Sequence, residues 1–145
     1  MDKLKLCAEL FSKLFDINYF CKIGRKGKMQ EFILTFDFPL IKPRLDYLYK
    51  LEEFMDSNDI IFNYEKRNNI YSNIDAVYLL QNEIDEVINY LFIDKNNDGT
   101  FFGRSFFPKE QKDYTIAQQR WTLLYKEKIN LSTNIKIIQY DKLSK

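Results

Sequence analysis

Apolar residues recur at helical spacing in three segments of the chain, Asp2–Phe15, Arg44–Met55 and Ser72–Leu91. In each segment, apolar positions three and four residues apart form a single stripe. Pro43 suits the first turn of the second segment, and Ser72 opens the third in a pattern similar to a capping box. The pattern therefore predicts three helices, of which the third is the longest and carries an acidic outer face.

Residues typical of β-strands fill most of the remaining chain. These runs are short, are rich in aromatic and β-branched residues, and are separated by turn formers such as Gly, Asn and Asp. They form three predicted strand–turn–strand units: Asn18–Ile23 with Met29–Phe36, Phe92–Ile93 with Phe101–Phe107, and Arg120–Ile129 with Asn134–Tyr140. Gly24 and Gly27 supply the backbone freedom that the first turn needs.

The order of these elements predicts an α+β fold. A helix, two strands, two helices and then three or four strands give an antiparallel sheet of four to six strands, with about three helices packed on one face. The chain has 145 residues, is 46% hydrophobic and contains only four glycines and three prolines, which is typical of one globular domain. We therefore expect a single α+β domain over residues 1–145.

The hydrophobic pattern contains no membrane-spanning or secretory segment. No apolar run approaches the ~18–20 residues that a spanning helix needs, and the first ten residues lack the apolar core of a signal peptide. Cys7 and Cys21 are too few for a disulfide scaffold and are expected to be reduced and buried. These features predict a cytoplasmic protein with no membrane partner.

Charge is distributed unevenly, although the net charge is only +1. Residues 20–50 carry seven basic and three acidic side chains, residues 52–98 carry three basic and eleven acidic ones, and residues 104–145 carry nine basic and four acidic ones. If the two basic segments meet in space, they form a positive face that attracts phosphates. The alternative is ordinary surface charge that is compensated between neighbouring elements.

Histidine is absent, and this excludes several kinds of site. Ser-His-Asp and Cys-His nucleophilic centres, a histidine general base and histidine-based zinc sites all require it. The glycine-rich phosphate loops of nucleotide-binding proteins are also missing. Residues 94–99 resemble the start of a calcium loop, but Ser105 stands where such a loop needs a glutamate. We therefore expect no metal and no cofactor.

The remaining side chains can support metal-free RNA cleavage, in which the 2′-hydroxyl attacks its own phosphate. The reaction needs a base, an acid and positive charge on the developing oxyanion, and Lys, Arg and Tyr can supply these. The candidates are Arg104, Tyr114, Arg120, Lys42, Arg44 and Tyr47, with Arg25, Lys26 and Lys28 at a hairpin tip as phosphate contacts. The alternative is that the arginines are ion-pair partners, the tyrosines boundary residues and the tip a soluble turn.

Two stretches resemble a known family. The segment Cys7–Leu51 combines a helix, a hairpin ending MQEFILTF and the helix RLDYLYKL, and a later segment reads RSFFPKEQKDYTIAQQRWTLLYKEK. Together they resemble the phage-associated nucleases of the barnase–EndoU–colicin–RelE-like superfamily. The resemblance implies a small α+β domain that cleaves RNA without a metal.

The resemblance also assigns site residues and shows one departure. It carries roles at the site to Arg44, Tyr47, Ser105, Tyr114 and Gln118, of which Ser105 and Gln118 are expected to bind RNA. The family pattern leads us to expect a histidine in the second helical segment, where this chain reads Ile-Lys-Pro-Arg-Leu at positions 41–45. The domain is therefore expected either to cleave RNA through other groups or to bind RNA only.

A second hypothesis is a non-catalytic inhibitor or adaptor that binds a host protein, such as a component of a defence system. The missing histidine and the aromatic surplus of 13 Phe, 10 Tyr and one Trp motivate it, because exposed aromatic residues commonly anchor interfaces. This hypothesis predicts an exposed aromatic or acidic patch on the predicted helix of residues 72–91. The expected partner is therefore RNA or a host protein.

Overall fold

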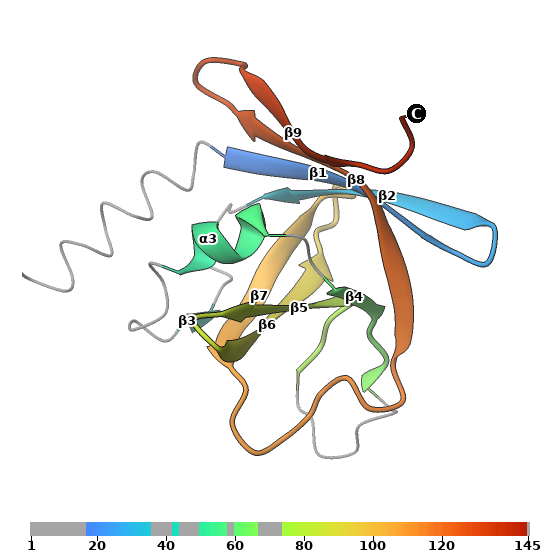
Figure 1. Cartoon of the computed structure of the whole chain (residues 1–145), viewed down its shortest axis with the longest axis vertical. Coiled ribbons are helices and arrows are strands. Elements are labelled where there is room, and N and C mark those ends of the chain that lie inside the picture. Colours follow the sequence, from blue (N-terminus) through green and yellow to red (C-terminus); the bar gives the residue numbers. More distant parts are fainter. Residues whose placement is uncertain (1–16, 36–41, 44–49, 58–59, 67–73, 145) are drawn as a thin grey trace, which may run out of the picture.

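The computed structural model describes residues 17–35, 42–43, 50–57, 60–66 and 74–144 (Figure 1). Within these residues the chain forms nine strands and one short helix. The strands are β1 (Ile17–Arg25), β2 (Lys28–Thr35), β3 (Lys42–Pro43), β4 (Ile60–Asn63), β5 (Tyr78–Ile84), β6 (Val87–Lys95), β7 (Phe101–Pro108), β8 (Gln119–Asn130) and β9 (Lys136–Asp141), and the helix is α3 (Leu51–Asp56). None of the described helices is long and apolar enough to cross a membrane.

Seven of the strands close into a barrel. Their order is β1-β2-β7-β6-β5-β4-β8, and β8 returns to pair with β1 along most of its length. The β2–β7 pair is parallel and short, whereas the other pairs around the barrel are antiparallel. Strand β9 extends the sheet beyond β8, and β3 pairs with β7.

The predicted α+β class is therefore wrong, and the main error is the predicted helix Ser72–Leu91. Its described part forms the antiparallel hairpin β5–β6 instead. We call this hairpin the wall, and both of its faces are buried. Leu80 and Leu91 face the barrel interior, while Leu79 packs in a second cluster on the outside. A strand that is apolar on both faces loses the alternation that identifies strands, and its apolar positions then also match a helical period.

The other predicted elements agree better with the structure. The first and last predicted strand–turn–strand units are present as β1–β2 and β8–β9. Strands β6 and β7 flank the predicted turn Asp94–Thr100, although β6 continues to Lys95. Of the predicted helix Arg44–Met55, the described part is helical at Leu51–Asp56. The predicted helix Asp2–Phe15 lies outside the described residues. Cys21 is buried as expected, and Cys7 also lies outside them.

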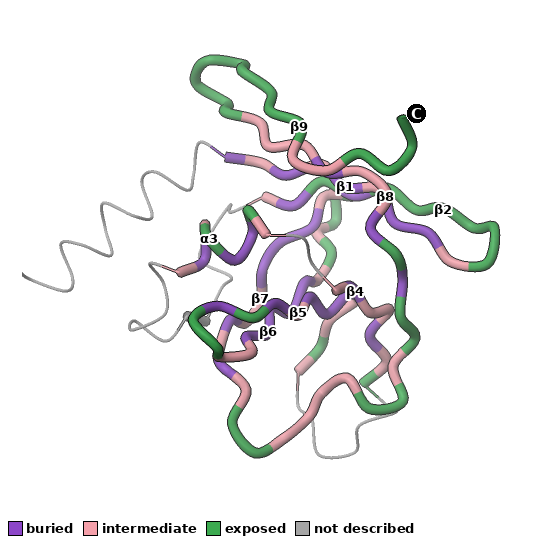
Figure 2. Tube along the Cα trace, viewed as in Figure 1, coloured by how far each residue is buried: buried purple, intermediate pink, exposed green. Residues whose placement is uncertain are grey.

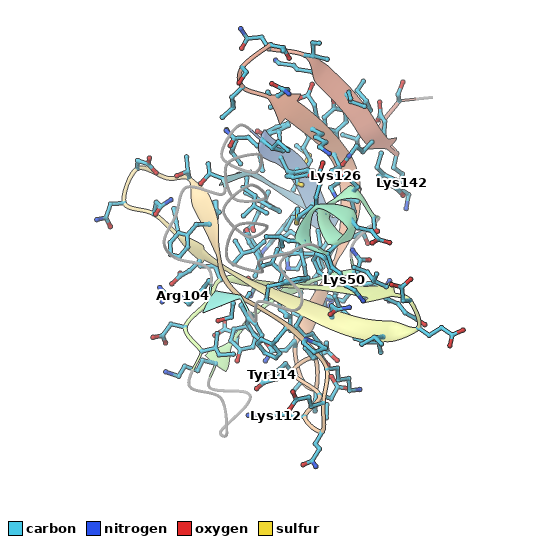
Figure 3. The ribbon with its side chains drawn as sticks, turned by 90° about the vertical axis from the view of Figure 1, so that its left-hand side faces the viewer. Lys50, Arg104, Lys112, Tyr114, Lys126 and Lys142 are labelled. Atoms are coloured by element: carbon cyan, nitrogen blue, oxygen red, sulfur yellow. The ribbon has the colours of Figure 1, made fainter. Side chains whose placement is uncertain are left out.

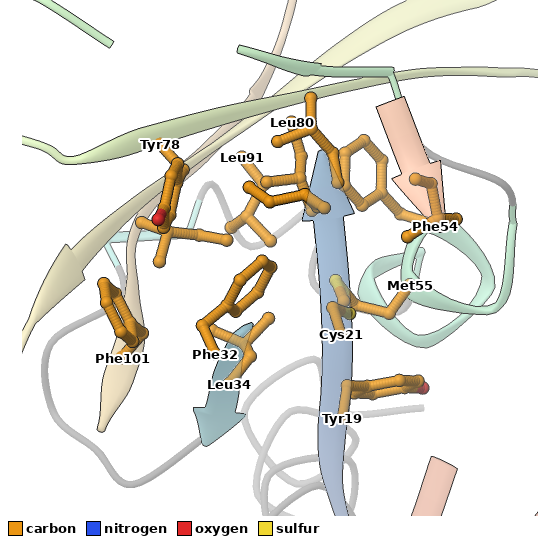
Figure 4. Close-up of a cluster of buried hydrophobic side chains, with 14 of the residues drawn as sticks. Tyr19, Cys21, Phe32, Leu34, Phe54, Met55, Tyr78, Leu80, Leu91 and Phe101 are labelled. Carbon is orange, nitrogen blue, oxygen red and sulfur yellow. The ribbon is translucent and has the colours of Figure 1, made fainter. Parts of the chain in front are cut away.

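The barrel interior is the main hydrophobic core. Figure 4 shows how β1, β2, β5, β6 and β7 contribute to it, and how Phe54 and Met55 of α3 enter it from one side. All three buried residues of α3, which also include Leu51, are fully inaccessible to solvent. The side-chain amide of Asn82 donates to the carbonyl of Phe54 at 2.9 Å, which ties the helix to β5.

A smaller aromatic cluster lies outside the barrel, on β4–β7. The segment between β7 and β8 passes over this wall and places Tyr114 on it. Figure 2 shows the result: β5 and β6 are buried over much of their length, whereas the tip of the β1–β2 hairpin and much of the β8–β9 hairpin are exposed. The molecule therefore has a wall that is covered on both faces and two hairpins that project into solvent.

Candidate functional site

The tip of the β1–β2 hairpin is basic and exposed. Lys22, Arg25, Lys26 and Lys28 stand along it, and the only carboxylate within Lys22–Glu31 is Glu31, whose oxygen lies 3.8 Å from the Lys22 amine. Lys26 and Lys28 are exposed. Lys26 and Gly27 form the turn with φ values of 50° and 78°, a geometry in which both residues have positive φ and which suits a two-residue hairpin loop.

Strand β8 brings Arg120 next to this tip. Arg25 donates from Nη1 to the carbonyl oxygen of Arg120 at 2.8 Å, and in the ladder Gly24 is the partner of Thr122. The Arg120 side chain is exposed. Cations from residues 22–28 and from residue 120, which are far apart in the sequence, therefore gather at one end of the β1–β8 pair.

The end of β9 adds a lysine that the sequence gave no reason to place here. The backbone N–H of Lys142 donates to the carbonyl of Leu124 at 2.9 Å. Leu124 in turn lies against Gly24: a Cβ added to Gly24 would come 2.8 Å from Cδ1 of Leu124. We call the surface formed by Lys22, Arg25, Lys26, Lys28, Arg120 and Lys142 the basic hairpin.

An aromatic pair adjoins the basic hairpin on β1 and β8. The rings of Phe20 and Tyr125 meet edge to face with centroids 6.1 Å apart, and the Lys22 amine lies 5.9 Å and 5.6 Å from the two centroids. Both rings are half-buried. Basic side chains beside accessible aromatic rings are the combination that proteins use to bind single-stranded nucleic acid.

Arg104 is placed elsewhere, on β7, and is held by an ion pair. Its Nη2 and Nε donate to the same carboxylate oxygen of Asp94 at 2.7 Å and 3.1 Å, and its guanidinium lies 5.4 Å from the centroid of Phe102. A guanidinium committed to a carboxylate is largely neutralised as a phosphate ligand. Ser105, next in the strand, is paired in the ladder with Phe92 and with Lys42 of β3.

Tyr114 belongs to the aromatic cluster outside the barrel. Its ring packs edge to face on Tyr90, Phe92 and Phe107 with centroid distances of 5.2 to 5.6 Å. Figure 3 shows Tyr114 with Lys112 in the lower part of the molecule, away from Lys126 and Lys142. A cavity of about 260 Å³ adjoins the ring of Tyr114. These contacts give Tyr114 a packing role.

Burial and the nearby charge of Asp113 raise the pKa of Tyr90, beneath Tyr114, to about 12. The Tyr90 hydroxyl lies 3.4 Å from the Asp113 carboxylate, which also accepts from the backbone and side chain of Thr115. The segment between β7 and β8 is thus fastened to the wall by its own turn and by aromatic contacts.

Gln118 also has a structural partner. Its side-chain oxygen accepts from the backbone N–H of Glu65 at 2.7 Å, and its amide nitrogen donates to the carbonyl of the same residue at 3.1 Å. Through these two bonds the Gln118 side chain pairs with the backbone of Glu65, just beyond the end of β4, as a neighbouring strand would. Arg44 and Tyr47 lie outside the described residues. Of the other predicted site residues, Arg25, Lys26, Lys28 and Arg120 gather at the basic hairpin. Apart from them, Ser105 pairs in the ladder with Lys42 and follows Arg104 on β7.

A second polar cluster, which the sequence did not reveal, fastens α3 to the barrel. Lys126 of β8 is fully buried and donates to the carbonyls of Met55 and Ser57 at the end of the helix (Figure 3). Lys128 lies 3.0 Å from both Glu52 and Asp56. A cation at a helix C-terminus satisfies carbonyls that have no partner within the helix, and it complements the helix dipole.

The charges of this cluster are matched to one another. Burial alone would raise the pKa of Asp56, but hydrogen bonds outweigh it and hold the pKa below its ordinary value; the donors are Gln139, Lys128 and Tyr19. Burial alone would lower the pKa of Lys128, but its bonds to the two carboxylates raise it. Both groups therefore stay charged near neutral pH, which suits ion pairs that hold α3 on the barrel and does not suit a group that takes up and releases protons. We call the cluster of Lys126, Lys128, Glu52 and Asp56 the clamp.

A cavity of about 440 Å³ lies beside the clamp. Its lining is part apolar and part polar: Ile17, Glu52, Lys128, Asn130, Thr133, Ile135 and Ile137. In the part of the chain that the structure describes, no three carboxylate or cysteine side chains gather in a way that could hold a metal ion.

Comparison with known proteins gives one match. The family model described as "phage-Barnase-EndoU-ColicinE5/D-RelE like nuclease" matches residues 37–143, about three quarters of the chain. No curated protein and no solved structure matches.

Proposed function

Because the chain belongs to the family of phage-Barnase-EndoU-ColicinE5/D-RelE-like nucleases, we propose that it acts on RNA and that the basic hairpin is the surface that meets the phosphate backbone. The observation that carries this proposal is the contact between Arg25 and Arg120, which joins two cationic segments separated by 95 positions. Their summed charge attracts a polyanion, and the adjoining Phe20–Tyr125 pair offers rings to unpaired bases.

Among the described candidates for catalysis, Arg120 is the one that we place at the RNA. In metal-free cleavage, a base takes the 2′-hydroxyl proton, the 2′-oxygen bonds to phosphorus, and the 5′-oxygen leaves with a proton from an acid. The products are a 2′,3′-cyclic phosphate and a 5′-hydroxyl end. The exposed guanidinium of Arg120 is suited to stabilise the charge that develops on the phosphoryl oxygens. Arg104 is less suited, because Asp94 already engages it.

Binding is tested by the salt dependence of affinity for a single-stranded RNA. Each phosphate contact contributes about 0.7 to the slope of log K against log salt, so Lys26→Glu/Lys28→Glu should reduce that slope by about 1.4 and weaken binding at low salt. The matched control is Lys66→Glu/Lys95→Glu, which makes the same charge change at two exposed lysines outside the basic hairpin. Equal losses in both double variants, or no salt-dependent binding by the wild type, would refute the proposed surface.

Cleavage is tested by incubating RNA with the protein in EDTA. Removing one donor to a developing oxyanion costs on the order of 10²–10³ in rate, so Arg120→Ala should abolish most cleavage, whereas Arg104→Ala should retain it. Arg120→Lys, which keeps the charge, should recover part of the rate. Salt-dependent binding without cleavage would instead identify the domain as an RNA-binding member of the nuclease family.

A further inference from the structure

Exposed apolar side chains gather on the β8–β9 hairpin. The described residues include eight large hydrophobic side chains that are exposed, and five of them fall between residues 131 and 143: Leu131, Ile135, Ile137, Ile138 and Leu143. The three isoleucines are 57% to 59% exposed. Isolated exposed apolar residues are ordinary, whereas five within thirteen residues are a local concentration, and Ile135 and Ile137 among them line the cavity beside Lys128.

Strand β9 also has an open edge. Among the described strands it pairs only with β8, so no described strand occupies its other side. Strand β2 leaves part of its edge open as well, because its pairing with β7 covers only Leu34 and Thr35. Both edges mix charged and exposed apolar residues, but β9 presents two adjacent exposed isoleucines, Ile137 and Ile138, whereas the exposed apolar residues Met29 and Ile33 of β2 stand apart.

We propose that β9 pairs with β9 of a second copy of this chain, antiparallel and about a two-fold axis. The strand begins with Lys136 and ends with Asp141. With the axis between Ile138 and Gln139, Lys136 lies opposite the partner's Asp141, and this pair occurs twice. A parallel pairing would bring like charges together, which destabilises a sheet. Isologous two-fold dimers are the commonest form of protein assembly.

The Asp141 end of β9 is held in place by local hydrogen bonds. The Asp141 carboxylate accepts from the backbone N–H groups of Leu143 at 3.0 Å and Ser144 at 2.9 Å, which holds it at the strand end. In the middle, the extra residue Gln139 forms a bulge opposite β8 and turns its amide to Asp56 at 2.8 Å. The bulge divides the expected ladder into two short parts, so we expect a modest affinity, on the order of micromolar.

The first experiment measures the oligomeric state of the full chain by sedimentation velocity over a range of concentrations. The wild type should show a monomer–dimer equilibrium, and Ile138→Lys should be monomeric. The control is Ile116→Lys, which places the same charge at a residue that is 66% exposed and outside the hairpin. A wild type that stays monomeric up to ~100 times the expected Kd, or a dimer that Ile138→Lys leaves intact, would overturn the proposal.

The second experiment tests the register through charge. Lys136→Glu converts both opposite-charge pairs into like-charge pairs and should weaken dimerisation roughly tenfold. Adding Asp141→Lys restores opposite charges, so the double variant should dimerise more tightly than Lys136→Glu alone. A double variant that is weaker still would rule out this pairing. Because dimerisation is measured without RNA, its outcome is independent of the proposed action on RNA.

Discussion

The β1–β2 and β5–β6 hairpins turn in the same way but lie in different surroundings. Each has a two-residue loop with positive φ at both positions: 50° and 78° at Lys26 and Gly27, and 51° and 67° at Asp85 and Glu86. Each also joins two long antiparallel strands. The local geometry of the turn therefore does not decide what a hairpin does in this fold.

Burial distinguishes the two hairpins. Strands β5 and β6 are covered on the inside by the barrel core and on the outside by the aromatic cluster, so their side chains serve packing. Strand β1 buries mainly its inward positions, such as Tyr19 and Cys21, and much of β2 is exposed. A hairpin that packs on one face leaves its other face and its tip to contact a ligand. This is why we place RNA at β1–β2.

The largest expected effect is a difference in the free energy of unfolding between variants on the outer faces of the two hairpins. Phe92→Ala removes a fully buried ring from β6 and should lower the free energy of unfolding by about 3–5 kcal/mol. Phe20→Ala removes a half-buried ring from β1 and should cost about a third as much. Urea denaturation of both variants measures this difference. Equal losses would show that both outer faces are structural.

A smaller effect is expected from exchanging the turn chemistry. Glu86→Gly relieves a side chain held at φ 67° and should stabilise the protein by about 1 kcal/mol, whereas Gly27→Ala imposes that strain at φ 78° and should destabilise it by about the same amount. No atom lies within 4 Å of a Cβ added at Gly27, so a loss there reports backbone strain alone. Thermal unfolding shows whether each variant is more or less stable than the wild type. A Gly27→Ala variant that is more stable would contradict this explanation by backbone strain.

The smallest effect is a dependence of stability on alkaline pH to which Tyr90 of the covered hairpin contributes. The pKa of Tyr90 is raised to about 12, above the ordinary value of 10, so the folded state holds the proton more tightly than the unfolded state does. The resulting stability is complete below about pH 10 and is lost as the pH rises toward 12. The wild type should therefore lose under about 1 kcal/mol between pH 8.5 and pH 10.5.

Tyr90→Phe is the control for this measurement, since it cannot ionise at that position. Its urea-unfolding free energy should change less than that of the wild type over the same pH range. If the two proteins respond identically, the alkaline loss arises from other groups, such as Tyr78 or Tyr125, whose pKa values are also raised.

The hairpins that are exposed on one side, β1–β2 and β8–β9, were predicted from the sequence. The hairpin β5–β6, which is covered on both sides, was predicted as a helix. In β1–β2, Gly24 and Gly27 and the β-rich runs on either side of them predicted both strands and the turn. In β5–β6, apolar residues on both faces removed the alternation, and Asp85-Glu86 is not a turn sequence that suggests positive φ. The predicted acidic helix, on which the host-protein hypothesis placed its patch, is therefore absent from the described part of residues 72–91, and that hypothesis stays a prediction.

The candidate site was predictable only where exposure follows from local sequence. Cations flanking a two-residue turn project into solvent whatever the fold, so Lys26 and Lys28 could be identified in advance. The partner of Arg104 could not be identified, because Asp94 is ten positions away and becomes a neighbour only when β6 pairs with β7. The same holds for Lys126, which meets the end of α3 across 71 positions.

The sequence by itself determined the types of chemistry available and most of the strands. With no histidine in the chain, any catalysis rests on other side chains, and the turn residues and alternation are local properties. Tertiary structure decided the rest: that the sheet closes through β1 and β8, that residues 78–95 are a covered wall, and that Arg25 meets Arg120. The physical reason is that closure and burial depend on pairings between distant segments, and local spacing does not encode these pairings.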